Sequence, residues 1–194
     1  MKFLNIQLDK MIYEISELHN LNLSQYKINK LVDQGVLKKI NRKYYENRNY
    51  DGDYNEFAYV SAYIESGVIC LISAASYYHL TSVRPLEIDT AVHRNRKIRN
   101  YPEWPTIKPY YFSENRYQIG IVNTNENDQC FKIYDINKTV VDIIYYREKI
   151  GIEETKQILL NYLNHKDRNL NLLYEYSKKL RCDNILKTYM EVLL

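Results

Sequence analysis

The chain has 194 residues, 45% of them hydrophobic and 26% charged, and its few glycines (5) and prolines (4) exclude collagen and flexible or proline-rich linker proteins. The longest apolar run, residues 68–75, is far shorter than the roughly 20 residues that a membrane-spanning helix needs. Residues 1–9 lack the continuous apolar core of a signal peptide, so we expect a cytoplasmic protein with no membrane partner.

Positive charge is concentrated in the first quarter of the chain. Residues 1–50 contain nine Lys or Arg and five Asp or Glu, whereas residues 51–194 contain eighteen and nineteen. The formal net charge of +3 therefore arises in the N-terminal quarter. A basic excess confined to one segment favours a polyanionic partner for that segment.

Two helices are predicted at the start of the chain. Residues 11–18 carry apolar side chains at helical spacing, and so do residues 24–34. Ser24 is a suitable N-cap for the second helix, and Gly35 suits the left-handed position that follows a helix end. The second helix leaves a polar and mostly basic face outside.

A basic hairpin follows the second helix. Residues 36–46 have the pattern of two short strands, with the turn at residues 41–42. Two helices and then a hairpin form the order of a winged helix-turn-helix. We assign this module to residues 1–50, because the segment 48–55 is polar, holds a turn-forming Asp-Gly pair and is a suitable domain boundary.

A helix-turn-helix inserts its second helix into the major groove of DNA, with the early residues of that helix near base edges. Gln and Asn can pair with adenine and Lys with guanine, while basic residues of the wing contact phosphates. The predicted DNA contacts on the helix are Ser24, Gln25, Tyr26, Lys27, Asn29 and Lys30. Those on the wing are Lys38, Lys39, Arg42 and Lys43. The alternative is a small structural module with a solvated basic face.

Residues 56–194 are predicted to form a second domain of mixed α/β structure with a helical tail, so that the fold class of the chain is α+β. Helices are predicted over residues 56–65, 68–80, 136–146, 152–163, 169–180 and 184–194. Strands are predicted over residues 87–93, 106–112, 117–122 and 130–134.

The second domain offers little catalytic chemistry. Its glycines are solitary, so it has no phosphate-binding loop, and it contains no nucleophile elbow or zinc-protease motif. The isolated cysteines and histidines predict no disulfide framework, no metal and no cofactor. Glu87 and Asp89 have the spacing of half a metal-nuclease site, but we find no lysine and third acid to complete it. We therefore expect a solvent-facing pair of acids and a protein that is not an enzyme.

The segment that begins at Tyr134 is the most distinctive part of the sequence. Lys138, Asp142 and Tyr145 share one face of the predicted helix by their spacing. A Lys–Asp pair four residues apart predicts a local ion pair worth about a few tenths of a kcal/mol. From the residues alone, the simplest interpretation is a capped helix with paired surface charges.

Three segments of the second domain resemble the C-terminal domain of the AbiEi family of antitoxins. The first is the run 138–142, followed by residues 146–151. The second is the apolar run 67–81, which has a Ser-Ala pair and a closing Leu-Thr. The third is the late helix 173–182, with the closing residues 189–193. The N-terminal module also fits the winged helix-turn-helix of this family in a shortened form, with the usual first helix reduced or missing.

The resemblance implies an antitoxin of a bacterial type IV toxin–antitoxin system linked to abortive infection by phage. The winged module is then expected to bind inverted repeats in double-stranded DNA of its own promoter and to repress the operon. The C-terminal domain is expected to counter a nucleotidyltransferase-like toxin, and a stable complex with the toxin is not required. The motif residues carried over by the resemblance are Ser73, Leu80, Thr81, Lys138, Thr139, Asp142, Arg147 and Gly151.

Two other functions remain open on the sequence. One is a ligand-sensing winged-helix regulator without a toxin, which a toxin gene directly downstream would argue against. The other is a nucleic-acid enzyme that uses Glu87, Asp89 and Asp142, which Mg²⁺-dependent cleavage lost in Asp89→Ala would support.

Overall fold

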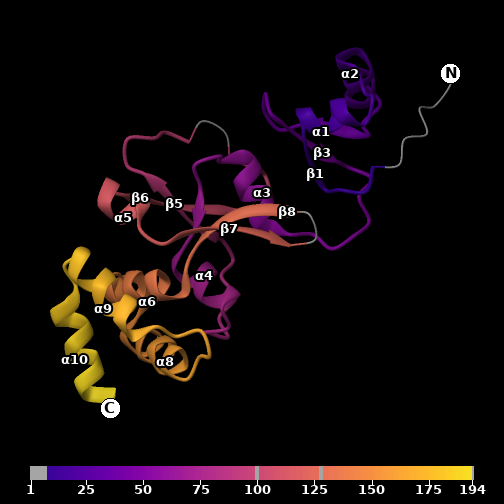
Figure 1. The fold of residues 1–194 in the computed structure, drawn as a ribbon. Coiled ribbons are helices and arrows are strands. Elements are labelled where there is room, and N and C mark those ends of the chain that lie inside the picture. The colour runs from indigo at the N-terminus through magenta and orange to yellow at the C-terminus, as the bar shows by residue number, and fades with distance from the viewer. Residues whose placement is uncertain (1–7, 99–100, 127–128, 194) are drawn as a thin grey trace.

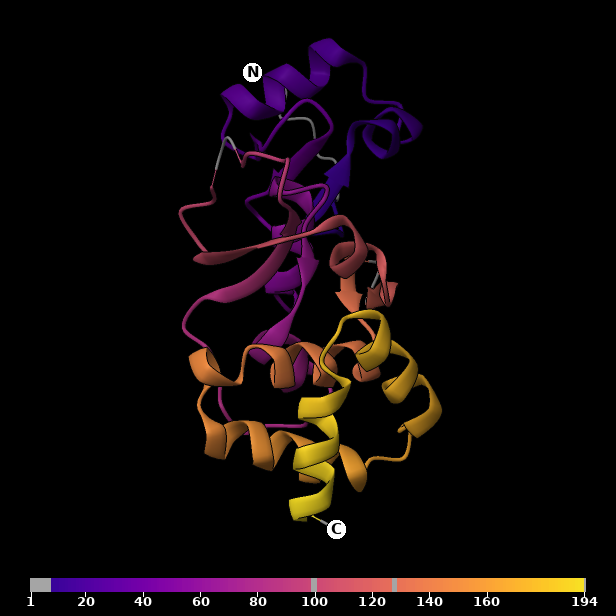
Figure 2. The same ribbon diagram turned by 90° about the vertical axis from the view of Figure 1, so that its left-hand side faces the viewer.

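The computed structural model describes residues 8–98, 101–126 and 129–193 and has mixed α and β structure. Its elements are β1 (Ile12–Glu14), α1 (Ile15–Asn20), α2 (Gln25–Asp33), β2 (Leu37–Lys39), β3 (Tyr44–Asn47), α3 (Glu56–Tyr63), β4 (Val68–Ile69), α4 (Leu71–Tyr77), β5 (Ile88–His93), β6 (Ile107–Phe112), α5 (Glu114–Gln118), β7 (Ile121–Glu126), β8 (Gln129–Tyr134), α6 (Ile136–Tyr145), α7 (Arg147–Ile150), α8 (Ile152–Leu163), α9 (Leu170–Lys179) and α10 (Asp183–Leu193). The molecule is elongated, with an N-terminal unit, a central sheet and a layer of helices following one another along its long axis (Figures 1 and 2).

The N-terminal unit, residues 8–50, consists of α1, α2 and a three-stranded antiparallel sheet of order β1-β3-β2. The Ser24 side chain accepts a hydrogen bond from the Lys27 amide, and Gly35 has a φ of 72°, so the predicted N-cap and left-handed position of α2 are confirmed. The apolar sides of both helices pack on one face of the sheet. The core residues of the unit are Tyr13, Leu18, Leu23, Ile28, Leu31, Leu37 and Tyr45.

The helix predicted over residues 11–18 is wrong in its first half. Ile12 and Tyr13 belong to β1 and lie opposite Glu46 and Tyr45 in β3. The sequence pattern fits a helix, but pairing with a distant strand completes the sheet and outweighs the local preference. The shortened helix α1 begins only at Ile15. Residues 1–7, where an earlier helix would begin, lie outside the described part of the chain.

The central sheet has the strand order β6-β5-β4-β8-β7. The pairs β5–β6 and β4–β8 are parallel, whereas β4–β5 and β7–β8 are antiparallel. The alternation of side chains along each strand supplies a separate core on each face. Ile69 and Val92 point toward the core around α3, and their neighbours Val68 and Ala91 point toward α4 and α6.

Helix α6 is the centre of the helical layer, with α4 on one side and the C-terminal helices α8, α9 and α10 on the other. Helix α6 contacts α4, α8 and α9, and α10 contacts α6, α8 and α9. Figures 1 and 2 place this layer at the end of the molecule opposite the N-terminal unit. The predicted strands near β5, β6 and β8 and the predicted helices near α3, α6, α8, α9 and α10 are confirmed with shifts of a few residues at their ends.

Two further predictions in the second domain are wrong in part. The helix predicted over residues 68–80 begins only at Leu71, because Val68 and Ile69 form the short central strand β4. The strand predicted over residues 117–122 is instead the end of α5 and the start of β7. Alternating apolar residues imitate a strand there, but the chain turns at Gly120 with a φ of 77°.

Gly120 is required by both its conformation and its surroundings. A Cβ atom at this position would lie 2.6 Å from Lys138 Cβ and 2.7 Å from Asp135 Oδ2. Gly151 also has a positive φ, of 105°, but no atom lies within 4 Å of a Cβ built on it. Substitution of Gly120 would therefore cause both backbone strain and a steric clash, whereas substitution of Gly151 would cause backbone strain alone.

We expect Gly120→Ala to lower the free energy of unfolding by about 2–4 kcal/mol, because left-handed strain adds to overpacking. Gly151→Ala should cost about 1–2 kcal/mol, since its backbone (φ 105°, ψ 139°) is strained for any other residue but no atom lies in the way of the new Cβ. Urea denaturation followed by circular dichroism measures both values. Equal losses in the two variants would contradict the packing described around Gly120.

Candidate nucleic-acid interface and buried charge cluster

The outer face of α2 is polar and open to solvent. Gln25, Tyr26 and Asn29 are exposed, and 76% of the Tyr26 surface is accessible. Gln25 Nε2 donates to Asn29 Oδ1 over 2.9 Å, so the two amides occupy adjacent turns of one face. Lys27 and Lys30 are half-buried at its sides. Ser24, which is also exposed, caps the helix.

The hairpin divides its lysines between the two faces of the small sheet. Lys39 lies opposite Tyr45, a residue of the core beneath α1 and α2, and its Nζ is 5.9 Å from the centre of that ring. Lys38 lies opposite Glu46, and its Nζ is 3.8 Å from Glu46 Oε2. Because neighbouring residues of a strand point to opposite faces, Lys39 shares the side of α2 and Lys38 does not.

The turn of the hairpin carries the other two predicted phosphate contacts. Arg42 is exposed, and within the described ranges no carboxylate lies at ion-pair distance from Arg42 or Lys39. Lys43, by contrast, pairs with Glu14 at 3.2 Å and with Glu65 at 3.7 Å. Lys43 therefore connects the N-terminal unit to the end of α3.

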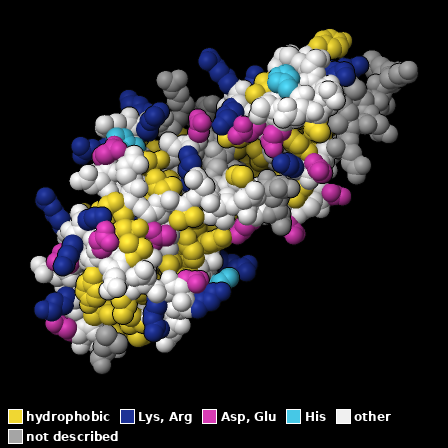
Figure 3. Space-filling view, viewed as in Figure 1, with side chains coloured by type: hydrophobic (Ala, Val, Ile, Leu, Met, Phe, Trp, Pro, Cys, Tyr) yellow, Lys and Arg dark blue, Asp and Glu magenta, His cyan; other side chains and the backbone are white. Residues whose placement is uncertain are grey.

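The charges of the N-terminal unit do not form one continuous basic patch on the face shown in Figure 3. Basic and acidic side chains are interspersed there. The same view shows hydrophobic side chains gathered over the C-terminal helices.

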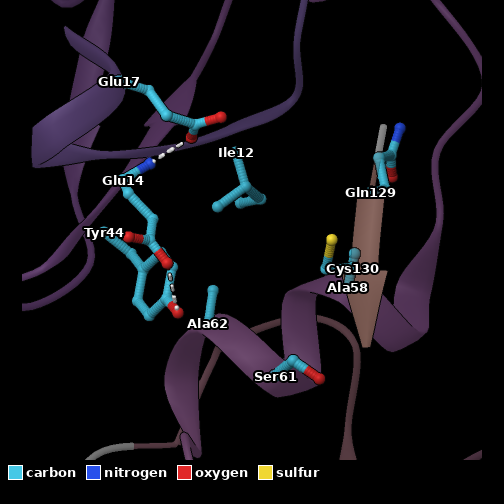
Figure 4. Close-up of a pocket in the computed structure, with 9 residues that line it drawn as sticks. All are labelled: Ile12, Glu14, Glu17, Tyr44, Ala58, Ser61, Ala62, Gln129 and Cys130. Carbon is cyan, nitrogen blue, oxygen red and sulfur yellow. Dashed lines mark hydrogen bonds between the residues drawn. The ribbon is translucent and has the colours of Figure 1, made fainter. Parts of the chain in front are cut away.

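A cavity of about 130 Å³ lies between the N-terminal unit and the central sheet (Figure 4). Ile12 and Tyr44 line it from the small sheet, Ser61 from α3, and Gln129 from β8. Ser61 Oγ and Gln129 Oε1 are buried without a hydrogen-bond partner in the described structure. A buried polar atom of this kind calls for water or a bound polar molecule.

The second candidate site of the sequence, around α6, is a buried charge cluster. Asp142 is fully buried, and its two carboxylate oxygens bind different cations. Arg116 Nη1 of α5 donates to Asp142 Oδ1 over 2.5 Å, and Lys138 Nζ donates to Asp142 Oδ2. Lys138 is also fully buried, whereas 7% of the Arg116 surface is accessible.

Aromatic rings surround the two cations of this cluster. Lys138 Nζ lies 4.1 Å from the centre of the Tyr134 ring, and the Arg116 guanidinium lies 3.7 Å from that of Tyr145. Burial lowers the pKa of Lys138, and Asp142 partly opposes this shift. The cluster places two cations beside one carboxylate in a site of low dielectric constant, so the carboxylate is essential to its charge balance.

The predicted Lys138–Asp142 pair therefore forms, but its expected position on the surface is wrong. The prediction missed Arg116, which lies 26 residues before Asp142 and binds its carboxylate from another helix. No local pattern in the sequence indicates this contact. A surface pair would contribute only about a few tenths of a kcal/mol, and that value does not apply to a buried one.

The expected solvent-facing pair of Glu87 and Asp89 is also wrong in part. Glu87 is exposed, but Asp89 is buried, and burial raises its pKa. Asp89 Oδ2 accepts the amide hydrogen of Ile72 over 3.1 Å, and the Asp89 amide donates to Ser73 Oγ over 2.9 Å. Asp89 thus satisfies a free amide at the start of α4, which is a structural role.

Most of the eight motif residues implied by the resemblance are buried in the helical layer. Leu80 is buried, and its carbonyl accepts a hydrogen bond from Asn161 of α8. The Thr81 hydroxyl donates to Glu154 of the same helix. Three motif residues reach the surface at least in part, namely Thr81, Arg147 and Gly151. The other five motif residues are buried, namely Ser73, Leu80, Lys138, Thr139 and Asp142.

Comparisons with known proteins add no family to this geometry. Neither the scan of the chain against protein-family models nor the search of curated proteins gives a match. Within residues 8–98, 101–126 and 129–193, no helix combines the length and apolar character required to cross a bilayer. The same residues contain no group of three or more His, Cys, Asp or Glu side chains arranged to hold a metal ion.

We expect Asp142→Asn to lower the free energy of unfolding by about 3–5 kcal/mol, because it leaves two buried cations without a carboxylate. Lys138→Met should change it by less than about 1.5 kcal/mol, since an apolar side chain of similar length replaces the surplus cation and the Arg116–Asp142 pair remains. Urea denaturation of both variants gives the two values. A smaller loss in Asp142→Asn than in Lys138→Met would contradict this account of the cluster.

Proposed function

We propose that the chain binds double-stranded DNA through α2 and the hairpin turn, as a winged helix-turn-helix, and represses its own operon. The observation that carries this proposal is the position of Gln25 and Asn29 on one open helix face. Lys39 lies on the same side of the small sheet as α2, and neither Lys39 nor Arg42 has a carboxylate at ion-pair distance in the described structure. Amide side chains can read adenine, and cations without a carboxylate partner are free to bind phosphate. This function belongs in the cytoplasm, where bacterial DNA lies.

The connectivity of the N-terminal unit supports the same proposal. Two helices joined by a short turn precede the β2–β3 hairpin, and β1 completes the sheet on its other side. In a winged helix the second helix enters the major groove while the wing contacts the adjacent backbone. Here the exposed residues of α2 are those expected to face bases, and Arg42 is in the turn.

The proposal extends to an antitoxin role for residues 56–194, in which the chain counters a nucleotidyltransferase-like toxin. This half rests on the resemblance of residues 67–81 and 138–151 to the AbiEi family. The surface around Thr81, Arg147 and Gly151 is the part of these motifs that is open to a partner. Co-expression with a nucleotidyltransferase encoded beside the gene tests this half, because the full chain should restore growth.

A ligand-sensing regulator is the second candidate, and the cavity between the units favours it. The cavity is bounded by both the N-terminal unit and the central sheet, and two of its polar atoms lack partners. A molecule bound there would alter the contact between the DNA-binding unit and the second domain. A small molecule that weakens operator binding, in a chain that fails to protect against the neighbouring toxin, would favour this candidate.

The primary test measures binding to the DNA upstream of the gene by fluorescence anisotropy, with a shuffled fragment as the control. We expect tighter binding to the native fragment and a steep loss of affinity with salt. Lys39→Ala should weaken binding to both fragments and reduce the salt slope by about one. Lys38→Ala is the matched control, because that side chain lies on the opposite face of the same strand.

Equal and weak binding to the native and shuffled fragments would overturn the proposal. An equal loss of the salt slope in Lys38→Ala and Lys39→Ala would contradict the assignment of the phosphate-binding face.

Base recognition is tested separately at Gln25. We expect Gln25→Ala to reduce the preference for the native over the shuffled fragment by about tenfold, since a lost bidentate contact removes about 1–3 kcal/mol of discrimination. Gln157→Ala in α8 is the matched control, because Gln157 donates to Asn161 with the same spacing and geometry as Gln25 to Asn29. An unchanged preference in Gln25→Ala would show that Gln25 does not contact bases.

A further inference from the structure

A groove of about 440 Å³ lies where the N-terminal unit meets the second domain, on the side of the small sheet away from α2. Lys38 and Glu46 line it from the hairpin, Tyr59 from α3, and Trp104 from the segment before β6. It is distinct from the cavity of Figure 4, with which it shares no lining residue. Neither the DNA-binding proposal nor the antitoxin proposal uses it.

Two exposed rings, Tyr54 and Trp104, form the walls of the groove, and the buried ring of Tyr59 packs against both of them. The rings of Tyr54 and Tyr59 are within 25° of parallel, with centres 6.5 Å apart. The Trp104 ring is nearly perpendicular to both, 6.4 Å from Tyr54 and 6.2 Å from Tyr59. Tyr50 supports Tyr54 from behind, and Tyr63 stacks on Tyr59. The walls are therefore held in place by their own ring contacts.

The same groove contains two carboxylates. Glu103 is exposed at the rim, whereas Glu46 is largely buried and its Oε2 atom has no hydrogen-bond partner in the described structure. Lys38 Nζ pairs with Glu46 Oε2 over 3.8 Å, which is beyond hydrogen-bond distance. The Tyr59 side chain lies against the same carboxylate, and its pKa is raised by burial and by that carboxylate. A buried carboxylate oxygen in this state favours an occupant of positive charge.

We propose that this groove binds an alkylated ammonium group. The negative faces of aromatic rings attract a cation whose centre lies within about 6 Å of them, and a methylated ammonium loses little hydration on entering. Glu46 supplies the compensating charge at the base of the groove, and Glu103 supplies it at the rim. A neutral apolar group of the same shape would gain nothing from the two carboxylates, and an anion would be repelled by both.

Lys38 is the competitor of this occupant. It is attached to the strand and its side chain is 36% exposed, so it stands at the edge of the groove. A bound cation that approaches Glu46 repels Lys38. Removal of the Lys38 charge should therefore strengthen the binding of a cation. It should leave the binding of a neutral occupant unchanged.

Trp104 is the single tryptophan of the chain and reports on the groove directly. The full chain is titrated with choline while tryptophan fluorescence is recorded, and then with the tert-butyl analogue in which carbon replaces the quaternary nitrogen. We expect choline to change the fluorescence at a concentration about tenfold lower than the analogue. A parallel titration with a trimethyllysine peptide distinguishes a free organic cation from a modified side chain as the source of the group.

Variants test the walls and the charge separately. We expect Tyr54→Leu and Glu46→Gln each to weaken choline binding about fivefold or more, and Lys38→Met to strengthen it about threefold. Tyr174→Leu is the matched control, because Tyr174 is a partly exposed tyrosine of α9 at the opposite end of the molecule and should leave binding unchanged. Tyr54 is 51% exposed, so its replacement is expected to leave the fold intact.

Equal responses to choline and to its neutral analogue would overturn the proposal, because the groove would then be merely apolar. An unchanged choline affinity in Glu46→Gln would overturn it as well. The proposal would also be overturned if choline left the tryptophan fluorescence unchanged in a chain that thermal melting shows to be folded.

Discussion

The carboxylate of Asp142 is the point on which the second domain depends. It binds Lys138 from the preceding turn of α6 and Arg116 from α5, and all three charges are removed from water. The arrangement holds α5 against α6, and Arg116 also approaches the carbonyl of Leu180 after α9. A buried cluster of this composition is intolerant of losing its anion, so it constrains the positions of α5, α6 and the end of α9 relative to one another.

The sheet above this cluster connects the two ends of the molecule. Its face toward α6 supplies the rings that cover Lys138, and its other face packs on α3. Helix α3 in turn contacts β1 of the N-terminal unit, where Met11 packs with Ala58 and Tyr59. The amide of Asn41 adds a hydrogen bond to the Ala62 carbonyl. The N-terminal unit is therefore attached to the second domain by direct contacts as well as by the chain.

Because the two parts of the chain are in direct contact, binding at the contact between them can affect both proposed activities. Helix α2 lies on the side of the N-terminal unit away from the junction (Figure 1), whereas the hairpin turn touches it: Asn41 donates to the Ala62 carbonyl and Lys43 pairs with Glu65. The cavity around Ser61 and the aromatic groove around Trp104 both lie at the junction. An occupant of either one would touch both parts of the chain and change the energy of their contact. Binding there is thus positioned to affect the proposed DNA-binding face of α2 without touching it.

Local spacing along the chain is enough to predict helix α2 with its cap, the hairpin, most strands of the sheet and the three tail helices. The sequence also located the basic excess in the N-terminal quarter. Three features become visible only in the folded chain: residues 12–14 pair as a strand, Asp89 accepts a free amide at the start of α4, and Arg116 closes a buried cluster on Asp142. These outcomes depend on partners distant in the sequence and on burial. Burial changes the energy of a charge by several kcal/mol, which no local pattern encodes.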